Sequence, residues 1–194
     1  MNADRKLEKK EKLSLRGELL KLLKESFIYN DDPVFTLSSG RKSRFYIDSK
    51  KVTLDPSGGF LVGQLILDAI HDLEVDAIGG MTLGADPLAI SASVLSYGDG
   101  DPLPAFIVRK DPKGYGEAPF IEGNLNKGSN VVVVDDVLTG GNSVEKTIKI
   151  LEDLDCKILR IIALVDRKEG GKEKLEKLGY DVVALFTVED LLKA

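Results

Sequence analysis

Residues 131–143, VVVVDDVLTGGNS, are the stretch from which the rest of the chain can be interpreted. The four consecutive valines predict a β-strand that is buried on both of its faces. Asp135 and Asp136 follow at the carboxyl end of this strand, and a loop of small residues then leads into a helix that begins near Asn142. Glycines let the backbone N–H groups of such a loop approach a ligand, and a helix N-terminus adds positive partial charge. The stretch therefore predicts a cradle for one phosphate group.

The two acidic residues beside this cradle are unsuited to phosphate, because two negative charges would repel it. They suit the hydroxyl groups of a sugar, or a hydrated cation that accompanies a second phosphate group. We therefore expect a site for a phosphorylated sugar. The pattern differs from the phosphate loop of nucleotide-binding proteins, because no lysine follows the glycines. Taken alone, the same residues also fit an ordinary buried strand that ends in a polar turn.

Length and composition indicate one globular domain with a substantial core, since the chain has 194 residues, of which 43% are hydrophobic and 30% charged. The net charge of −5 argues against nonspecific nucleic-acid binding. The apolar runs are too short to span a bilayer, and the charged N-terminus is unlike a secretory signal, so no membrane partner is expected. The single cysteine, Cys156, excludes an internal disulfide, and the expected location is the cytoplasm.

Strands and helices alternate along most of the chain. Strands are predicted over 75–79, 105–108, 131–134, 158–165 and 182–186, and helices over 58–72, 84–97, 142–154, 171–178 and 188–192. This alternation indicates an α/β fold, with a mostly parallel sheet flanked by helices on both faces. In such sheets, ligands bind at the carboxyl ends of the strands.

The first 50 residues lie outside this alternation. Residues 1–12 are a charge-dense lead, and apolar residues at helical spacing predict a helix from Ser14 to about Ser26. Two β-rich runs, 34–37 and 44–48, flank a polar loop and suggest a hairpin. We expect residues 1–50 to form an N-terminal helix and hood, and residues 51–194 to form the core, within a single structural domain.

Two polar loops follow predicted strands. Residues 109–117, RKDPKGYGE, hold three cations and two glycines and would suit the oxygens of a diphosphate, although a solvated charged loop is the alternative. Residues 79–87, GGMTLGADP, place small residues at the start of a helix and form a second potential anion nest. An ordinary helix start that is capped by Asp86 is the alternative there.

A third cluster follows the strand at 158–165 and contains Arg167. A guanidinium at this place could make a two-pronged contact with a carboxylate. An ion pair with Asp166 or Glu169 is the alternative for this arginine.

These segments together resemble known proteins. Residues 131–143 resemble the motif that binds 5-phosphoribosyl 1-diphosphate (PRPP) in the type I phosphoribosyltransferases. Over roughly residues 14–192, the chain resembles the orotate phosphoribosyltransferase family. The resemblance is carried by FTLSSGRKSRFYID (35–48), GGMTLGADPLA (79–89), VRKDPKGYGE (108–117), IEG (121–123), VVVVDDVLTGGNS (131–143) and ALVDRKEGG (163–171). Many phosphoribosyltransferases share the acid pair, whereas the hood, the Arg-Lys loop and the Val-Asp-Arg segment point to orotate as the base.

The resemblance implies an enzyme of pyrimidine nucleotide synthesis, which joins orotate to PRPP to give orotidine 5′-monophosphate and diphosphate. It implies Mg²⁺ as the cofactor, held mainly by PRPP and water, so no metal ligand is expected from the protein. It also implies a homodimer in which a loop of one subunit closes over the site of its partner.

By the same resemblance, individual residues take roles. The catalytic residues would be Lys113, Asp135 and Asp136. PRPP would be bound by Arg109, Lys110, Lys113, Tyr115, Asp135, Asp136, Val137, Leu138, Thr139, Gly140, Gly141, Asn142 and Ser143. Orotate would contact Phe45, Tyr46, Thr139 and Arg167.

The chain departs from the family pattern in its cations. Tyr115 stands where the family's loop usually has histidine, and a tyrosine carries no positive charge at neutral pH. Ser38 and Gly84 stand where many relatives have lysine. We expect Arg41, Lys42 or Arg44 to compensate for the lysines that this chain lacks.

Two other functions fit parts of the pattern. A phosphoribosyltransferase for a purine or uracil would share the acid pair, but a neutral base offers Arg167 no carboxylate. A regulator that binds PRPP without turnover would normally carry a nucleic-acid-binding module, and the sequence contains no sign of one.

Overall fold

The computed structural model describes residues 6–36, 42–112 and 120–193. Six strands form the central sheet: β5 (Ala77–Met81), β6 (Ala105–Val108), β7 (Ile121–Gly123), β8 (Asn130–Leu138), β9 (Lys157–Asp166) and β10 (Val182–Thr187). Their order in space is β10-β9-β8-β5-β6-β7, and every neighbouring pair is parallel except β6 and β7. The predicted mostly parallel sheet is therefore confirmed.

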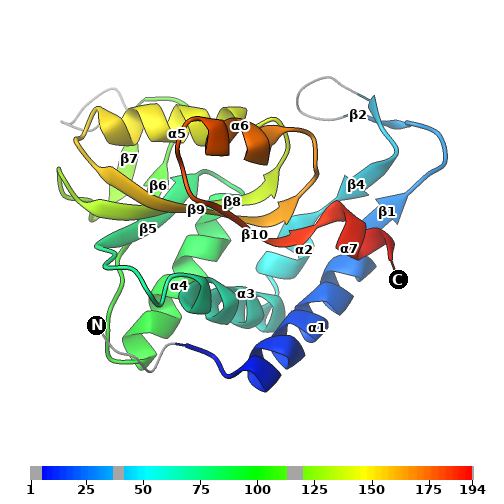
Figure 1. Ribbon diagram of the computed structural model, residues 1–194, viewed down its shortest axis with the longest axis horizontal. Coiled ribbons are helices and arrows are strands. Elements are labelled where there is room, and N and C mark those ends of the chain that lie inside the picture. The colour runs from blue at the N-terminus through cyan, green and yellow to red at the C-terminus, as the bar shows by residue number, and fades with distance from the viewer. Residues whose placement is uncertain (1–5, 37–41, 113–119, 194) are drawn as a thin grey trace.

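Helices cover both faces of this sheet (Figure 1). One face carries α5 (Asn142–Glu152) and α6 (Gly171–Lys177), and the other carries α1 (Lys9–Glu25), α3 (Pro56–Ala69) and α4 (Ala85–Gly98). The four valines of β8 divide between the two cores because successive side chains of a strand point to opposite faces. Val131 and Val133 pack with α5 and α6, and Val132 and Val134 pack with α1, α3 and α4. All four are at most 1% exposed, as the sequence predicts.

Strand β8 is longer than predicted, and this changes the setting of the acid pair. The strand continues past Val134 to Leu138, because its end remains paired with β9: Asp135 lies opposite Ala163, and Leu138 lies opposite Asp166. Asp135 and Asp136 therefore belong to the last part of the strand and do not follow it. The short antiparallel strand β7 lies in the segment 109–129, for which no strand was predicted.

The hood consists of two small strand pairs beside the main sheet. Strand β1 (Phe27–Tyr29) pairs with β4 (Phe45–Ile47), and β2 (Phe35–Thr36) pairs with β3 (Lys42–Ser43). The predicted hairpin between 34–37 and 44–48 is therefore wrong in its pairing. The chain bends at Arg44, where the Ser43 hydroxyl accepts a hydrogen bond from the Phe45 N–H at 3.2 Å, and β4 leaves β3 to pair with β1.

Helix α1 begins at Lys9, five residues before the predicted start at Ser14, because tertiary contacts hold the charged lead in place. The Leu7 N–H donates to Asp68 Oδ1 at 2.9 Å, and the Lys12 ammonium pairs with the other oxygen of Asp68. The helix shares one core with α3, and its buried residues are Leu19 and Leu23. The division of the chain at residue 50 stays a prediction.

Two short helices complete the fold. Helix α2 (Ser49–Thr53) follows β4 directly and leads into α3, and α7 (Val188–Leu192) follows β10. Helix α2 brings the end of the hood against the sheet, which matters for the site described below. Within the described residues, none of the helices has the length and apolar character needed to cross a membrane.

Candidate active site

The topology of the sheet places a crevice at the ends of β5 and β8. The chain adds β6 on one side of β5 and later places β8 on its other side, so the strand order reverses between β5 and β8. Ligands of open α/β sheets bind at such a reversal, outside the carboxyl ends of the strands. A cleft of about 460 Å³ lies at this point, between the hood, α2 and the ends of both strands.

Most of the predicted site residues that the structure describes line this cleft. They are Tyr46, Lys110, Asp135, Asp136, Val137, Thr139, Ser143 and Arg167. These residues come from the hood, from the end of β6, from β8 with its loop, and from the end of β9. The fold therefore brings together side chains that are far apart in the sequence.

Other predicted residues lie elsewhere. Arg109 pairs with Glu122 at 3.0 Å and lines a neighbouring hollow, which shares Lys110 with the cleft. Leu138, Gly140, Gly141 and Asn142 belong to the strand end and loop but do not line the cleft. Lys113 and Tyr115 lie outside the described residues, as do Ser38 and Arg41.

The loop after β8 is held by a close approach to the loop after β9. The Gly171 N–H donates to the Thr139 carbonyl at 2.9 Å. A Cβ atom at position 171 would lie 2.3 Å from the Thr139 oxygen, so the two loops can come this close because residue 171 is glycine. Helix α5 starts directly after Gly141, and Glu145 in its first turn is paired with Lys174 at 2.6 Å. The N-terminus of α5 therefore keeps its positive partial charge beside the cleft.

The acid pair has an uneven electrostatic environment. Asp135 is 7% exposed. Burial, followed by the negative charge of Asp136, raises the pKa of Asp135 to about 8, although hydrogen bonds from the Ser143 side chain and the Asp136 backbone act in the opposite direction. In the free protein, Asp135 is therefore mostly protonated at neutral pH and can donate a hydrogen bond.

Asp136 instead has donors around both of its oxygens. Its Oδ2 atom accepts from the Ser49 hydroxyl at 2.5 Å and lies 3.5 Å from the Lys50 ammonium. Its Oδ1 atom accepts from the Val137 N–H at 3.0 Å. A Cβ atom at Gly84 would lie 2.1 Å from this Oδ1 atom, so the loop after β5 adjoins the carboxylate. That contact also explains why position 84 cannot carry a lysine with Asp136 in this position.

Arg167 is held from several sides. Its side chain is buried, with Nη2 donating to the Ser43 hydroxyl at 2.8 Å and Nε paired with Glu169 at 2.9 Å. Its guanidinium lies over the ring of Phe45, 4.3 Å from the centroid. The ion pair with Glu169 that the sequence allowed is present, and Arg167 lines the cleft as well. Phe45 thus supports the guanidinium, while the next residue of the strand, Tyr46, lines the cleft.

Sequence reasoning missed Ser49 and Lys50, the donors to Asp136. They follow the hood strand, and the signal available in the sequence was a cation directly after a β-rich run. The contact between Ser49 and Asp136 spans 87 residues and depends on where α2 lies, which periodicity does not reveal.

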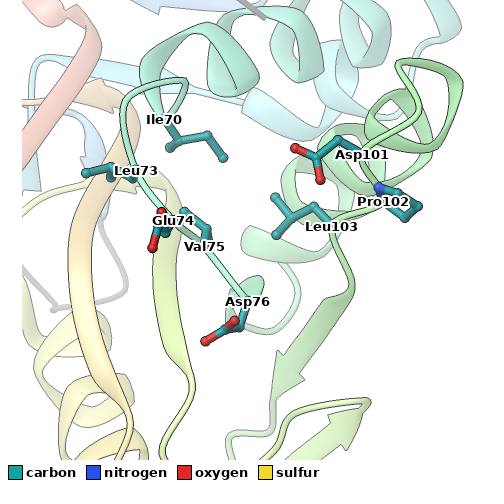
Figure 2. A pocket seen from close by; sticks show the side chains of 8 residues that line it. All are labelled: Ile70, Leu73, Glu74, Val75, Asp76, Asp101, Pro102 and Leu103. Atoms are coloured by element: carbon teal, nitrogen blue, oxygen red, sulfur yellow. The ribbon is translucent and has the colours of Figure 1, made fainter. Parts of the chain in front are cut away.

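A second hollow lies at the opposite edge of the sheet, where β5 and β6 begin (Figure 2). It measures about 210 Å³, and its lining comes from the connections α3–β5 and α4–β6. The charged residues of its lining are Glu74, Asp76 and Asp101, which are all acidic. This composition is unsuited to a phosphorylated ligand, so the cleft at the carboxyl ends of the strands is the candidate site.

Comparison with known proteins identifies the family to which the chain belongs. A family model described as "Phosphoribosyl transferase domain" matches residues 87–186. The orotate phosphoribosyltransferase of Aquifex aeolicus is 43% identical over 178 residues, which cover 91% of this chain and 97% of that protein. The orotate phosphoribosyltransferase of Thermosynechococcus vestitus is 42% identical over 179 residues, which cover 91% of this chain and 93% of that protein.

Solved structures give the same result. The orotate phosphoribosyltransferase of Mycobacterium tuberculosis H37Rv in complex with PRPP matches with a TM-score of 0.75 and 32% identity, covering 91% of this chain and 98% of that one. The Aeropyrum pernix orotate phosphoribosyltransferase matches with a TM-score of 0.73 and 34% identity, covering 90% and 96%. The chain has the type I phosphoribosyltransferase fold and belongs to the orotate phosphoribosyltransferase family.

Proposed function

We propose that this protein transfers the 5-phosphoribosyl group of PRPP to orotate, giving orotidine 5′-monophosphate and diphosphate for pyrimidine nucleotide synthesis. The observation that carries the proposal is the composition of one cleft. At the reversal of strand order, it combines a helix N-terminal loop, a pair of carboxyl groups and a buried arginine. These groups match the phosphate, the sugar hydroxyls and the carboxylate of the two substrates.

In this proposal, the loop from Val137 to Ser143 binds the 5′-phosphate, and Asp135 and Asp136 bind the ribose hydroxyls. A protonated Asp135 can donate to one hydroxyl, while Asp136 accepts from another. Displacement at the anomeric carbon develops positive charge on the sugar ring, and nearby carboxyl groups stabilise that charge most when both are ionised.

The base binds at the hood end of the cleft. Arg167 takes the carboxylate of orotate, and its contacts with Ser43, Phe45 and Glu169 fix the plane of the guanidinium before the substrate arrives. Tyr46 and Thr139, which both line the cleft, contact the ring. Preorganisation of this kind lowers the cost of orienting two anions next to each other.

The leaving diphosphate is neutralised by cations that follow β6. Lys110 lines the cleft, and Arg109 stands in the adjoining hollow. The proposed roles of Lys113 and Tyr115, and of Arg41, concern residues outside the described part of the chain. For compensation by Lys42, the supporting contact is a hydrogen bond of 2.8 Å to the hydroxyl of Thr36, a residue of the cleft.

Mg²⁺ fits this site as a companion of PRPP. Within the described residues, no three His, Cys, Asp or Glu side chains are grouped so as to hold a metal ion. The carboxyl groups that line the cleft are those of Asp135 and Asp136, and Asp136 already has Ser49 and Lys50 as partners. These donors suit a hydrated ion that PRPP oxygens hold and that neutralises diphosphate charge when it is bound.

We also propose that the enzyme is a cytoplasmic homodimer. Exposed apolar side chains gather around a hollow of about 400 Å³ between α3 and α4, and they include Leu54, Phe60, Ile90 and Val94. An apolar group of this kind on α/β enzymes is suited to burial against a second subunit. The free cysteine, Cys156, is compatible with a reducing compartment.

Turnover tests the proposed function. Protein, Mg²⁺ and PRPP are mixed with orotate, uracil or adenine, and release of diphosphate is followed. We expect turnover with orotate alone. Turnover with adenine or uracil would assign the protein to another base, and PRPP binding without turnover on any base would indicate a regulator.

A substitution tests the proposed carboxylate contact. Arg167→Ala should abolish the use of orotate while PRPP still binds, because the variant removes the partner of the orotate carboxylate. Arg160→Ala is the control, since Arg160 lies in β9, the strand that Arg167 directly follows, and pairs with Asp72 and Asp181 away from the cleft. Orotate turnover at the wild-type rate in the Arg167 variant would remove that residue from the proposed role.

A further inference from the structure

The two acids of the pair face different parts of the cleft. Asp135 is hydrogen-bonded to Ser143, at the start of α5. Asp136 contacts Ser49 and Lys50 of α2 and adjoins Gly84 in the loop after β5. A PRPP molecule whose 5′-phosphate sits at α5 and whose ribose lies over the acids therefore extends its diphosphate toward the Asp136 side.

A diphosphate on the Asp136 side of the cleft needs positively charged side chains near it, and the loop after β5 on that side supplies none. Asp136 repels a diphosphate, and position 84 has no room for a side chain while Asp136 stays in place. The loop from Thr82 to Gly84 offers no cationic side chain. Lys110 follows β6 and lines the cleft, so a further cation for the diphosphate has to come from a different element of its wall.

Lys50 is placed to do this. Its ammonium lies 3.5 Å from Asp136 Oδ2, and its side chain lines the cleft and is 44% exposed, so a ligand can reach it. Ser49, which precedes it, is fully buried and donates to the same oxygen at 2.5 Å. The Ser49 side chain is short and buried, so its hydroxyl can keep Asp136 in position when Lys50 moves. Lys50 can move because its side chain is a flexible four-carbon stem.

We propose that Lys50 binds the diphosphate of PRPP, and that in the free protein an ion pair with Asp136 keeps its ammonium beside the diphosphate position. The inference rests on the proposed function. When PRPP enters, the ammonium exchanges the carboxylate for a diphosphate oxygen, and Asp136 becomes available to a ribose hydroxyl. Lys50 thereby contributes a cation from α2 to the end of the cleft where the leaving group forms.

The experiment compares Lys50→Gln with Lys51→Gln. Lys51 is the next residue of the same helix and lines a separate shallow hollow with Leu22 and Glu25, so it controls for the loss of one positive charge. Calorimetry measures binding of Mg²⁺-PRPP, Mg²⁺-diphosphate and ribose 5-phosphate to each protein, and thermal unfolding checks the fold. Binding is measured without orotate, so the result does not depend on turnover.

We expect Lys50→Gln to weaken PRPP and diphosphate binding about tenfold to a hundredfold, the range of a charge-assisted hydrogen bond. Ribose 5-phosphate should bind as to the wild type, Lys51→Gln should change nothing, and Lys50→Arg should restore most of the affinity. Unchanged affinity of Lys50→Gln for both PRPP and diphosphate would mean that Lys50 serves only as a partner of Asp136, and it would overturn the inference. Equal weakening by both glutamine variants would overturn it too, since the effect would then be general electrostatics.

Discussion

Two neighbouring carboxyl groups in one strand have different surroundings, and this difference is the residue-scale basis of the site. Asp135 is buried, and the negative charge of Asp136 adds to the effect of burial, so the pKa of Asp135 rises to about 8. Asp136 has a hydroxyl, an ammonium and a backbone N–H around it. Paired acids whose surroundings differ in this way can take different protonation states at one pH.

The raised pKa of Asp135 predicts a pH-dependent stability. A carboxyl group with an ordinary pKa of 3.8 in the unfolded chain and about 8 in the folded protein keeps its proton on folding between these values. Stability therefore falls as pH rises through this window and becomes level above it. Between pH 5 and pH 8 the loss is on the order of 3 kcal/mol.

Asp135→Asn isolates this contribution, because the amide keeps the shape and does not ionise. Denaturant unfolding of both proteins at pH 5 and pH 8 is the measurement. The variant should gain stability relative to the wild type as pH rises. If the difference in unfolding free energy between the two proteins is the same at pH 5 and pH 8, the pKa of Asp135 is not raised in the folded protein.

At the scale of elements, the site depends on how closely the loop after β8 approaches the loop after β9. Gly171→Ala places a Cβ atom 2.3 Å from the Thr139 carbonyl oxygen, so the loop that contains Thr139 must shift. We expect a loss of about 1–3 kcal/mol in unfolding free energy and about tenfold in PRPP affinity. Unfolding by denaturant and calorimetric titration measure the two effects.

Gly17→Ala is the matched control, because position 17 lies in α1 and a Cβ atom there would meet nothing within 4 Å. That variant should leave PRPP affinity unchanged and gain about 0.5–1 kcal/mol in unfolding free energy. If Gly171→Ala binds PRPP like the wild type, the approach of the two loops does not shape the phosphate cradle.

The elements that the sequence predicted well are those whose burial leaves a pattern. Val131 to Val134 are apolar without interruption because each face of β8 meets a separate core. The hood strands have two or three residues, too few for a period, and so their pairing was wrong. Strand β7 has three residues and was missed for the same reason.

The residues of the candidate site also fall into those that the sequence reveals and those that only the fold brings together. The motif from Asp135 to Ser143 is contiguous, so its chemistry was visible in the sequence. Ser49 and Lys50 reach Asp136 because α2 turns back over the sheet after β4, and that depends on tertiary packing. For Arg167, the sequence allowed either contact with a ligand carboxylate or an ion pair with Asp166 or Glu169. The structure shows the pair with Glu169, and the contacts of the guanidinium with Ser43 and Phe45, which come from the distant hood, could not be read from the sequence.

At the scale of the whole molecule, the exposed apolar side chains of α3 and α4 predict self-association. Val94→Glu places a charge among them, where Val94 is 67% exposed, and should give a single-chain species because a charge at the centre of an interface must be desolvated. Sedimentation equilibrium of the wild type should give the mass of two chains. Leu178→Glu, an exposed apolar position at the end of α6, is the control and should remain dimeric.

A wild-type protein that sediments as a single chain would contradict the proposed dimer. A Val94→Glu variant that remains dimeric would move the interface away from α3 and α4, and the homodimer itself would stand.

In the proposed function, the tip of β8 binds PRPP, with the 5′-phosphate at the start of α5 and the ribose over Asp135 and Asp136. A crystal structure of the protein with Mg²⁺ and PRPP tests it most directly. We predict that the phosphate accepts hydrogen bonds from the loop between Thr139 and Ser143, and that the ribose hydroxyls lie within hydrogen-bond distance of both acids. PRPP bound elsewhere, with this cleft empty, would contradict the account.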